Sequence, residues 1–209
     1  MISKFNFLMG VVWLFAFTGA RAQTSTIADA SIQGTPYMDE AYVQGEIYYG
    51  NSKRIFPLRY NAFQDLMEYK QNGQPLVLDP NPTITKVHFG STTFVVEKLE
   101  SKGKTKYGFL ALLDSGRVML FSKRVIAFHA AKKGGALDGS DQPARFTRVP
   151  DVYYYKIGDG DLHEVESIKS MIASLPGRQA ELMTFAKKEK VSPRKENTLI
   201  QLVQYYNSL

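Results

Sequence analysis

The acidic segment "GDGDLHEVE" contains the densest group of side chains that could do chemistry. Its ionisable members lie within eight residues and are Asp159, Asp161, His163, Glu164 and Glu166. Hard cations take several oxygen ligands from such loops, so Asp159 and Asp161 are candidate ligands for Ca²⁺. A calcium loop would need a third polar ligand and a glycine where Leu162 and His163 stand. The alternative interpretation is a turn followed by an acidic helix start, where carboxylates favour the positive end of the helix dipole.

Five tyrosines form a second candidate group, because tyrosine rings can stack on sugars. They are Tyr48, Tyr49, Tyr153, Tyr154 and Tyr155. Consecutive residues of a strand point to opposite faces, so about half of these rings should belong to the core or cover a sheet. The single tryptophan, Trp13, lies in a predicted signal peptide. A glycan-binding site is therefore disfavoured.

The sequence lacks the common catalytic motifs. It has no G-x-S-x-G nucleophile elbow and no G-x-x-x-x-G-K-[ST] phosphate loop. His163 begins "HEVE", which lacks the second histidine of H-E-x-x-H, and the only other histidines are His88 and His129. Because there is no cysteine, a thiol nucleophile, a thiolate metal ligand and a disulfide are all excluded. We therefore predict no catalytic residue and no cofactor.

The formal charge is +6, from 26 lysines and arginines against 20 aspartates and glutamates. The cations fall in segments that resemble turns or a helix surface: Lys98 to Lys106, Lys123 and Arg124, Lys132 and Lys133, and Lys187 to Lys195. A protein that binds nucleic acid usually gathers its cations along one element, with stacking aromatics between them. We interpret these cations as solvated faces and predict no nucleic-acid partner.

Residues 40–163 show the pattern of an antiparallel β-domain. Large apolar or aromatic side chains occur at every second residue, at Phe56, Leu58 and Tyr60, with Pro57 and Arg59 between them. This period of two is typical of a half-buried strand. The Asn–Gly pair at 72–73 predicts a hairpin, because a type I′ turn needs positive φ at both central residues. The run "FLALL" lacks alternation and predicts a strand buried on both faces. Further short runs separated by glycine-bearing turns fit a meander, a sandwich or a half-barrel.

Two segments differ from this pattern. The glycine-rich and charged residues 130–144 predict a long surface loop that is either functional or disordered. Residues 164–209 change to a helical period and predict three short helices, the last beginning with Ser192 as N-cap and Pro193 as first residue. Their apolar positions are Ile168, Met171, Ile172, Leu175, Leu182, Phe185, Ala186, Leu199, Leu202, Val203 and Tyr206. Helices this short should pack on each other and on the sheet.

Residues 1–22 have the layout of a secretory signal peptide. A lone cation, Lys4, precedes an apolar run, and the small-residue pattern "ARA" closes the segment. This layout predicts cleavage between Ala22 and Gln23 and export to the periplasm or beyond. The apolar run is shorter than the roughly 20 residues of a membrane span, so we expect no transmembrane segment after processing. The small and polar residues 23–39 then predict a flexible lead.

The stretch "RIFPLRYNAFQDLMEYKQNG" is explained almost entirely as strand and turn, and only Arg59, Asn61 and Asp65 lack a clear role. With the ending "FAKKEKVSPRKENTLIQLVQYYNSL", it resembles a group of uncharacterised exported proteins of Bacteroidota. Members of that group share a "LRYN…D.MEFK..G" hairpin, a "GDG" turn and a closing helix that ends near "YYN". The resemblance implies an envelope location in a Gram-negative bacterium and points to no particular reaction.

The sequence thus predicts an α+β chain, in which an antiparallel β-domain precedes a small C-terminal helical segment. The leading functional hypothesis is an exported, non-enzymatic envelope protein that binds or scaffolds an envelope partner. The second hypothesis is a periplasmic carrier that holds a lipid or another apolar ligand inside a curved sheet. A hydrolase with a dispersed site is the third. No oligomeric state follows from the sequence.

Overall fold

The computed structural model describes residues 32–101, 103–134 and 139–209. The predicted signal peptide with its cleavage site at Ala22 and Gln23 lies outside these ranges, as do residues 23–31 of the predicted lead. Residues 135–138 of the predicted glycine-rich loop also lie outside them. No helix in the described part of the chain combines the length and the apolar character needed to cross a membrane.

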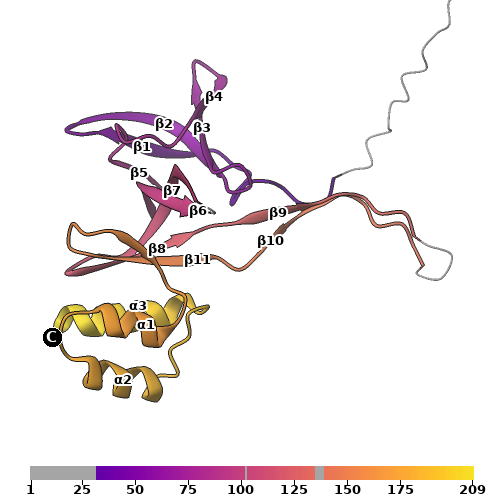
Figure 1. The fold of residues 1–209 in the computed structure, drawn as a ribbon. Coiled ribbons are helices and arrows are strands. Elements are labelled where there is room, and N and C mark those ends of the chain that lie inside the picture. Colours follow the sequence, from indigo (N-terminus) through magenta and orange to yellow (C-terminus); the bar gives the residue numbers. More distant parts are fainter. Residues whose placement is uncertain (1–31, 102, 135–138) are drawn as a thin grey trace, which may run out of the picture. The chain divides into compact units, whose positions relative to one another are not determined.

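Ten strands form one antiparallel sheet that curls into a half-barrel (Figure 1). In sheet order they are β12 (Leu162–Glu164), β11 (Val152–Ile157), β8 (Val118–Lys123), β7 (Lys104–Asp114), β6 (Thr92–Ser101), β5 (Lys86–Phe89), β1 (Val43–Tyr49), β2 (Ser52–Asn61), β3 (Leu66–Gln71) and β4 (Gln74–Leu78). The remaining elements are the strands β9 (Ile126–His129) and β10 (Arg145–Arg148) and the helices α1 (Ile168–Ser174), α2 (Gln179–Lys188) and α3 (Glu196–Ser208). The predicted α+β class is confirmed, with the half-barrel as the sheet arrangement.

Tight turns join neighbouring strands, as the turn residues predict. Asn72 and Gly73 both have positive φ, at 51° and 78°, which is the backbone that a type I′ turn requires. Strands β3 and β4 pair directly across this turn, beginning with Gln71 opposite Gln74. The backbone preference of two residues therefore sets the register of the whole hairpin.

Strand β1 departs from a simple meander because it lies between β2 and β5. Residues 79–85 carry the chain from β4 back to β5, and Ile84 in this connection is buried in the same core cluster as Ile47 of β1. Gly45 lies where β5 approaches closely. A Cβ at that position would stand 2.5 Å from the Cβ of Phe89, so only glycine lets the two strands pair here.

The core sits on both faces of the sheet. Strand β7 lies near the middle of the sheet order, and its residues Phe109 and Leu110 are both fully buried although they point to opposite faces. This confirms the two-sided burial that "FLALL" predicts. Phe109 belongs to a cluster inside the N-terminal curl with Tyr60 and Phe94, while Leu110 packs with Leu99 in a smaller cluster.

The three helices pack against β8 and β11 (Figure 1). The buried members of their predicted apolar stripes are Met171, Ile172, Leu175, Leu182, Ala186, Leu199, Leu202, Val203 and Tyr206. Helix α3 begins at Glu196, with Lys195 as N-cap, and not at Ser192 and Pro193 as predicted. The intervening residues form a turn in which the Lys195 N–H donates to the Ser192 carbonyl at 3.1 Å.

Strands β9 and β10 form a separate hairpin that we call the arm, comprising residues 126–134 and 139–148 (Figure 1). Its pairing continues past the strands, because the backbones of Lys132 and Gln142 exchange two hydrogen bonds, of 2.9 and 2.8 Å. The Gly134 N–H also donates to the Asp141 carboxylate at 2.8 Å. The described parts of the predicted loop therefore extend the hairpin.

Residues 32–39, the described part of the predicted flexible lead, are hydrogen-bonded to other segments. The Gln33 N–H donates to the Ala144 carbonyl, and the Met38 N–H donates to the Tyr60 carbonyl, each at 3.0 Å. These bonds hold the segment against the arm and against β2. Polar composition does not reveal them, because they use backbone groups that every residue carries.

Candidate functional site

The predicted metal candidates lie at the turn between β11 and β12. Asp159 is exposed in this turn, where the Gly160 N–H donates to the Ile157 carbonyl at 3.0 Å, and Asp161 follows at the rim of a pocket. Within the described ranges, no three histidine, aspartate or glutamate side chains are placed to hold a metal ion together. The alternative of an acidic helix start is wrong, because "LHE" forms β12 and the next helix begins only at Ile168.

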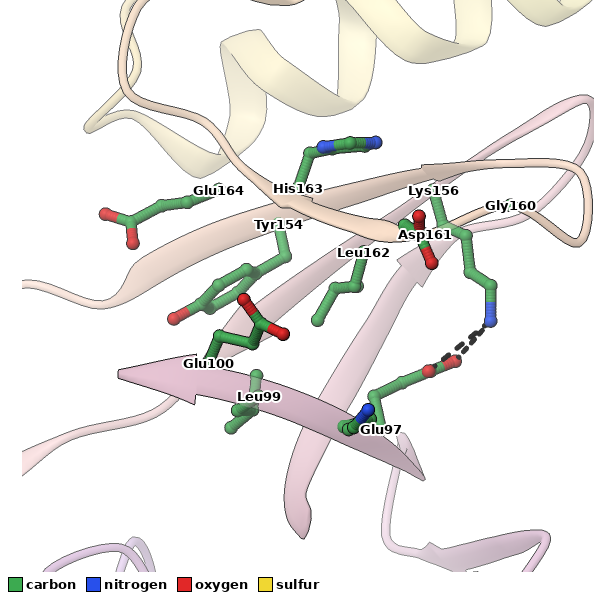
Figure 2. A pocket seen from close by; sticks show the side chains of 11 residues that line it. Glu97, Leu99, Glu100, Tyr154, Lys156, Gly160, Asp161, Leu162, His163 and Glu164 are labelled. Carbon is green, nitrogen blue, oxygen red and sulfur yellow. Dashed lines mark hydrogen bonds and ion pairs between the residues drawn. The ribbon is translucent and has the colours of Figure 1, made fainter. Parts of the chain in front are cut away.

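The pocket that Asp161 lines lies between β6 and β12, and we call it the seam pocket (Figure 2). Its volume is about 520 Å³. Its lining residues are Glu97, Lys98, Leu99, Glu100, Tyr154, Lys156, Gly160, Asp161, Leu162, His163 and Glu164. Strands β7, β8 and β11 separate β6 from β12 in the sheet order, so only the curl of the sheet brings the two together. Among the strands that the structure describes, β12 pairs only with β11, which leaves its other edge open.

Apolar side chains form the floor of the seam pocket. Leu99 of β6 is buried, and Tyr154 and Leu162 are half-buried beside it. Leu110 and Phe121 lie in the same cluster and pack behind this floor, on the face of the sheet opposite to Phe109. The site is therefore a groove at the mouth of a packed core and not a deep apolar cavity.

Carboxylates dominate the rim of the seam pocket. Glu97 is paired across the pocket with Lys156, at 3.0 Å between Oε1 and Nζ (Figure 2). Glu100, Asp161 and Glu164 make no side-chain hydrogen bond or ion pair with any residue that the structure describes. These three carboxylates are solvated and available to a ligand that carries positive charge.

Only one of the five candidate tyrosines lines the seam pocket. Tyr154 faces it, whereas Tyr153 and Tyr155 are buried in the core cluster that contains the helices. The expected alternation of this run is thus confirmed, while Tyr48 and Tyr49 lie on β1 and do not contribute. Burial and, next, the charge of a nearby glutamate raise the pKa of Tyr154, so its phenol stays neutral and able to donate a hydrogen bond.

A second polar group is buried at the turn between β2 and β3. Asp65 Oδ1 forms an ion pair with Lys123 and accepts hydrogen bonds from the Tyr60 hydroxyl at 2.8 Å and the Phe109 N–H at 3.3 Å. Burial raises the pKa of Tyr60, and the charge of Asp65 adds to the effect. Burial also lowers the pKa of Lys123, although Asp65 acts in the opposite direction. The group joins the β2–β3 turn to β7 and β8.

This burial corrects the interpretation of Lys123 and Arg124 as solvated cations. Only 13% of the Lys123 side chain and 17% of the Arg124 side chain are exposed. Arg124 pairs with Asp151 at 2.5 Å and with Glu196 at 2.7 Å. All the partners of these two cations are distant in sequence, so local charge patterning could not reveal the pairs.

A third polar group fixes the lead to the outer face of β2 and β3. Glu68 accepts hydrogen bonds from Arg59 Nε at 2.9 Å, Arg59 Nη2 at 2.6 Å, the Tyr37 hydroxyl at 2.8 Å and the Tyr42 hydroxyl at 3.0 Å. The Arg59 guanidinium also stacks 3.6 Å from the centre of the Tyr37 ring. With four donors on one carboxylate, this group is closed and has no capacity for a ligand.

The three residues that had no role in the sequence all have structural ones. Arg59 holds Glu68, Asp65 holds Lys123, and Asn61 Oδ1 accepts a hydrogen bond from the Gln64 N–H at 3.0 Å. The pocket residues of β6, by contrast, carried no signal, because they lie some 60 positions before Asp161. Comparison with known proteins adds nothing to this site, since no family model, curated protein or solved structure matches the chain.

Proposed function

We propose that this chain is an exported, non-enzymatic binding protein whose seam pocket receives an extended, basic segment of a protein partner. The observation that carries the proposal is an acidic groove with an apolar floor, which lies between β6 and one face of β11 and β12, beside the free edge of β12 at the end of the sheet. A strand edge with unpaired backbone groups can accept another strand by hydrogen bonding, which is a common mode of peptide recognition.

The side chains around the groove define the chemistry of the segment. The pocket lining contains two more carboxylates than ammonium groups. The carboxylates belong to Glu97, Glu100, Asp161 and Glu164, and the ammonium groups belong to Lys98 and Lys156. Successive residues of a bound strand would face the floor and the solvent rim in turn. A segment that alternates apolar and basic residues fits this arrangement, because its apolar residues reach the floor and its cations reach the carboxylates.

The same features give less support to a carrier of apolar ligands. The side chains of Leu99, Leu110 and Phe121 pack closely behind the floor of the groove, and the rim of the groove is charged. An apolar ligand bound there would bring the carboxylates of Glu100 and Glu164 into contact with hydrocarbon, which is costly. Native mass spectrometry of the purified protein should therefore show no bound lipid.

The proposed export and the proposed kinship with Bacteroidota envelope proteins rest on the first 22 residues and on the quoted motifs. Processing has a direct test. If Ala22 and Gln23 flank the cleavage site, the mature protein lacks Trp13, the only tryptophan of the chain, and shows no tryptophan fluorescence. Tryptophan emission from protein recovered from the producing cells would contradict export by cleavage.

The binding proposal is tested by fluorescence anisotropy with two labelled peptides, each about ten residues long, that alternate valine with lysine or with glutamate. We expect the valine–lysine peptide to bind at least about tenfold more tightly, because its charge complements the rim. Binding should weaken as salt rises, since the carboxylates are exposed. Equal binding of the two peptides, or no binding of either, would overturn the proposal.

Matched variants locate the binding. The double variant Glu100→Lys/Glu164→Lys reverses two rim charges that have no partner among the described residues, and it should abolish binding of the valine–lysine peptide. Glu189→Lys makes the same chemical change at the end of α2, outside the pocket lining, and should leave binding unchanged. If the two variants bind the peptide equally well, the peptide binds elsewhere.

A further inference from the structure

We infer that the segment received by the seam pocket is the arm of a second copy of this chain. This inference rests on the proposed function and names its partner. The arm shares two features with the segment that the groove calls for, because it is extended and basic, and it also carries an exposed aromatic side chain, Phe128, at its base. The two surfaces lie on one chain, so a single protein carries both halves of the interface.

The charge of the arm complements that of the groove. The described residues of the arm include the cations Lys132, Lys133, Arg145 and Arg148, against the single carboxylate of Asp141. The side chains of Lys132 and Lys133 are exposed, and no ion pair engages them in the part of the chain that the structure describes. Consecutive lysines of an extended segment point to opposite faces, so one of them can meet the rim while the other stays in solvent.

The arm also has the reach that the groove needs. Residues 130–134 continue beyond β9, and at roughly 3.3 Å per residue they extend about 16 Å. Strand β12 has three residues and spans roughly 10 Å on the same scale. The described part of the arm that continues past β9 is thus long enough to lie along the whole open edge of β12.

The base of the arm exposes aromatic side chains. Phe128 of β9 is 42% exposed and lies in a group of three aromatic rings with Phe63 and Phe146, at centroid distances of 6.3 and 5.0 Å. Phe63 is itself 45% exposed. Exposed aromatic side chains at the base of a projecting hairpin are typical of surfaces that bind another protein.

Other basic segments fit the groove less well. The lysines of α2 and its C-terminal end lie on or beside a helix, whose backbone groups already pair within the element and cannot add to a strand edge. Lys98, Lys104 and Lys106 lie on β6 and β7, the hairpin that forms one wall of the pocket, so they cannot enter it as a separate strand. The arm is an extended hairpin outside the large sheet.

The contact is heterologous, because the arm of one copy meets the groove of the next and not its own equivalent. Such contacts produce rings or open rows of molecules instead of closed twofold dimers. The average mass of the mature protein should therefore keep rising with concentration, without stopping at the mass of a dimer. The valine–lysine peptide competes for the groove and should return the assemblies to monomers.

The inference is tested by sedimentation velocity of the mature chain and two charge reversals. Lys132→Glu/Lys133→Glu in the arm and Glu100→Lys/Glu164→Lys in the groove should each weaken association at least about tenfold, because like charges then meet. Mixing the two variants should restore association, since the intact groove of the first meets the intact arm of the second. The glutamates of the reversed arm and the lysines of the reversed groove also have complementary charges. The variant that combines all four changes should therefore associate with itself again.

A zero-length carbodiimide reagent supplies the position of the contact, because it joins a lysine to a carboxylate only when the two touch. In a mixture of ¹⁴N- and ¹⁵N-labelled protein, we expect mixed-isotope links from Lys132 or Lys133 to Glu100, Asp161 or Glu164. Links of one isotope only would place the arm in the groove of its own chain and overturn the inference.

The failure of this inference differs from the failure of the proposed function. A protein that binds the valine–lysine peptide but stays monomeric at every concentration has the binding groove and a different partner. A protein that associates, but does so equally well after either charge reversal, uses another surface and also overturns the inference. If the unmodified protein does not bind the valine–lysine peptide, the proposed function itself is wrong.

Discussion

Glu68 and the glutamates of the seam pocket are alike in residue type and differ in what surrounds them. Glu68 accepts four hydrogen bonds from Arg59, Tyr37 and Tyr42, whereas Glu100 and Glu164 have no side-chain partner among the described residues. The carboxylate of Glu68 is fully hydrogen-bonded within the fold, whereas those of Glu100 and Glu164 can bind a ligand. For a protein without a catalytic motif, the satisfaction of each charge therefore separates structural groups from candidate sites.

The largest loss of stability is expected when one charge is removed from the buried ion pair of Asp65 and Lys123. Lys123→Met leaves Asp65 buried without its cation, and we expect the free energy of unfolding to fall by about 3–5 kcal/mol. The side chains of Asp65 and Lys123 are only 10% and 13% exposed, so solvent can replace little of the lost interaction. Urea denaturation followed by circular dichroism measures the change.

The double variant Asp65→Asn/Lys123→Met is the matched control. Asparagine tolerates the positive φ of 63° at position 65 and removes the unpaired charge, so part of the lost stability should return. If the double variant is as unstable as the sum of its two single variants, Asp65 and Lys123 are not coupled.

A smaller loss of stability is expected when the charge of Glu68 is removed. Glu68→Gln keeps the shape of the side chain but removes the charge that Arg59 and the two tyrosines bind, and we expect a loss of about 2 kcal/mol at pH 7. Burial alone would raise the pKa of Glu68, but the hydrogen bonds outweigh burial and hold the pKa below its ordinary value.

The pKa of Glu68 fixes how this loss depends on pH. A carboxyl whose pKa is lower in the folded than in the unfolded chain stabilises the fold above the unfolded pKa, which is about 4.3 for glutamate. That contribution disappears as the pH falls through the folded pKa. The stability difference between the parent and Glu68→Gln should therefore shrink below about pH 4. A difference that stays constant down to pH 3 would contradict the role of charge.

The smallest effect on stability is expected at the unpaired carboxylates of the seam pocket. Glu100→Gln/Glu164→Gln should change the free energy of unfolding by less than about 0.5 kcal/mol, because exposed carboxylates without partners contribute little to stability. The same variant should bind the valine–lysine peptide several-fold more weakly. A large loss of stability would mean that the rim carboxylates hold the fold, which would remove the basis for treating them as a site.

Short-range patterns predicted the elements well. The Asn72–Gly73 turn, the two-sided burial of "FLALL" and the apolar stripes of the helices each follow from neighbours in the chain, and the structure confirms all three. Proline cannot donate a ladder hydrogen bond, yet Pro57 lies in β2, which is internal in the sheet order. The pairing of β2 with β3 ends at Leu58, so the missing N–H of Pro57 lies just past that ladder.

The candidate site could not be predicted in the same way. Its two walls come from β6 and β12, and the distance between them is set by the curl of the intervening strands. Curl depends on accumulated twist and packing across several strands, which no local motif encodes. Asp161 was identifiable as part of an acidic turn, but its meaning changed from a candidate metal ligand to part of a pocket rim.

The position of β1 between β2 and β5 has a consequence for how the chain acquires its structure. During synthesis β1 can pair with β2 almost at once, but its second edge stays open until residues 86–89 have been made. The region from β1 to β4 is thus an incomplete unit for some time, with an unpaired strand exposed to misassociation. Closure by β5 is a long-range step, and the narrow space at Gly45 makes that step sensitive to any side chain placed there.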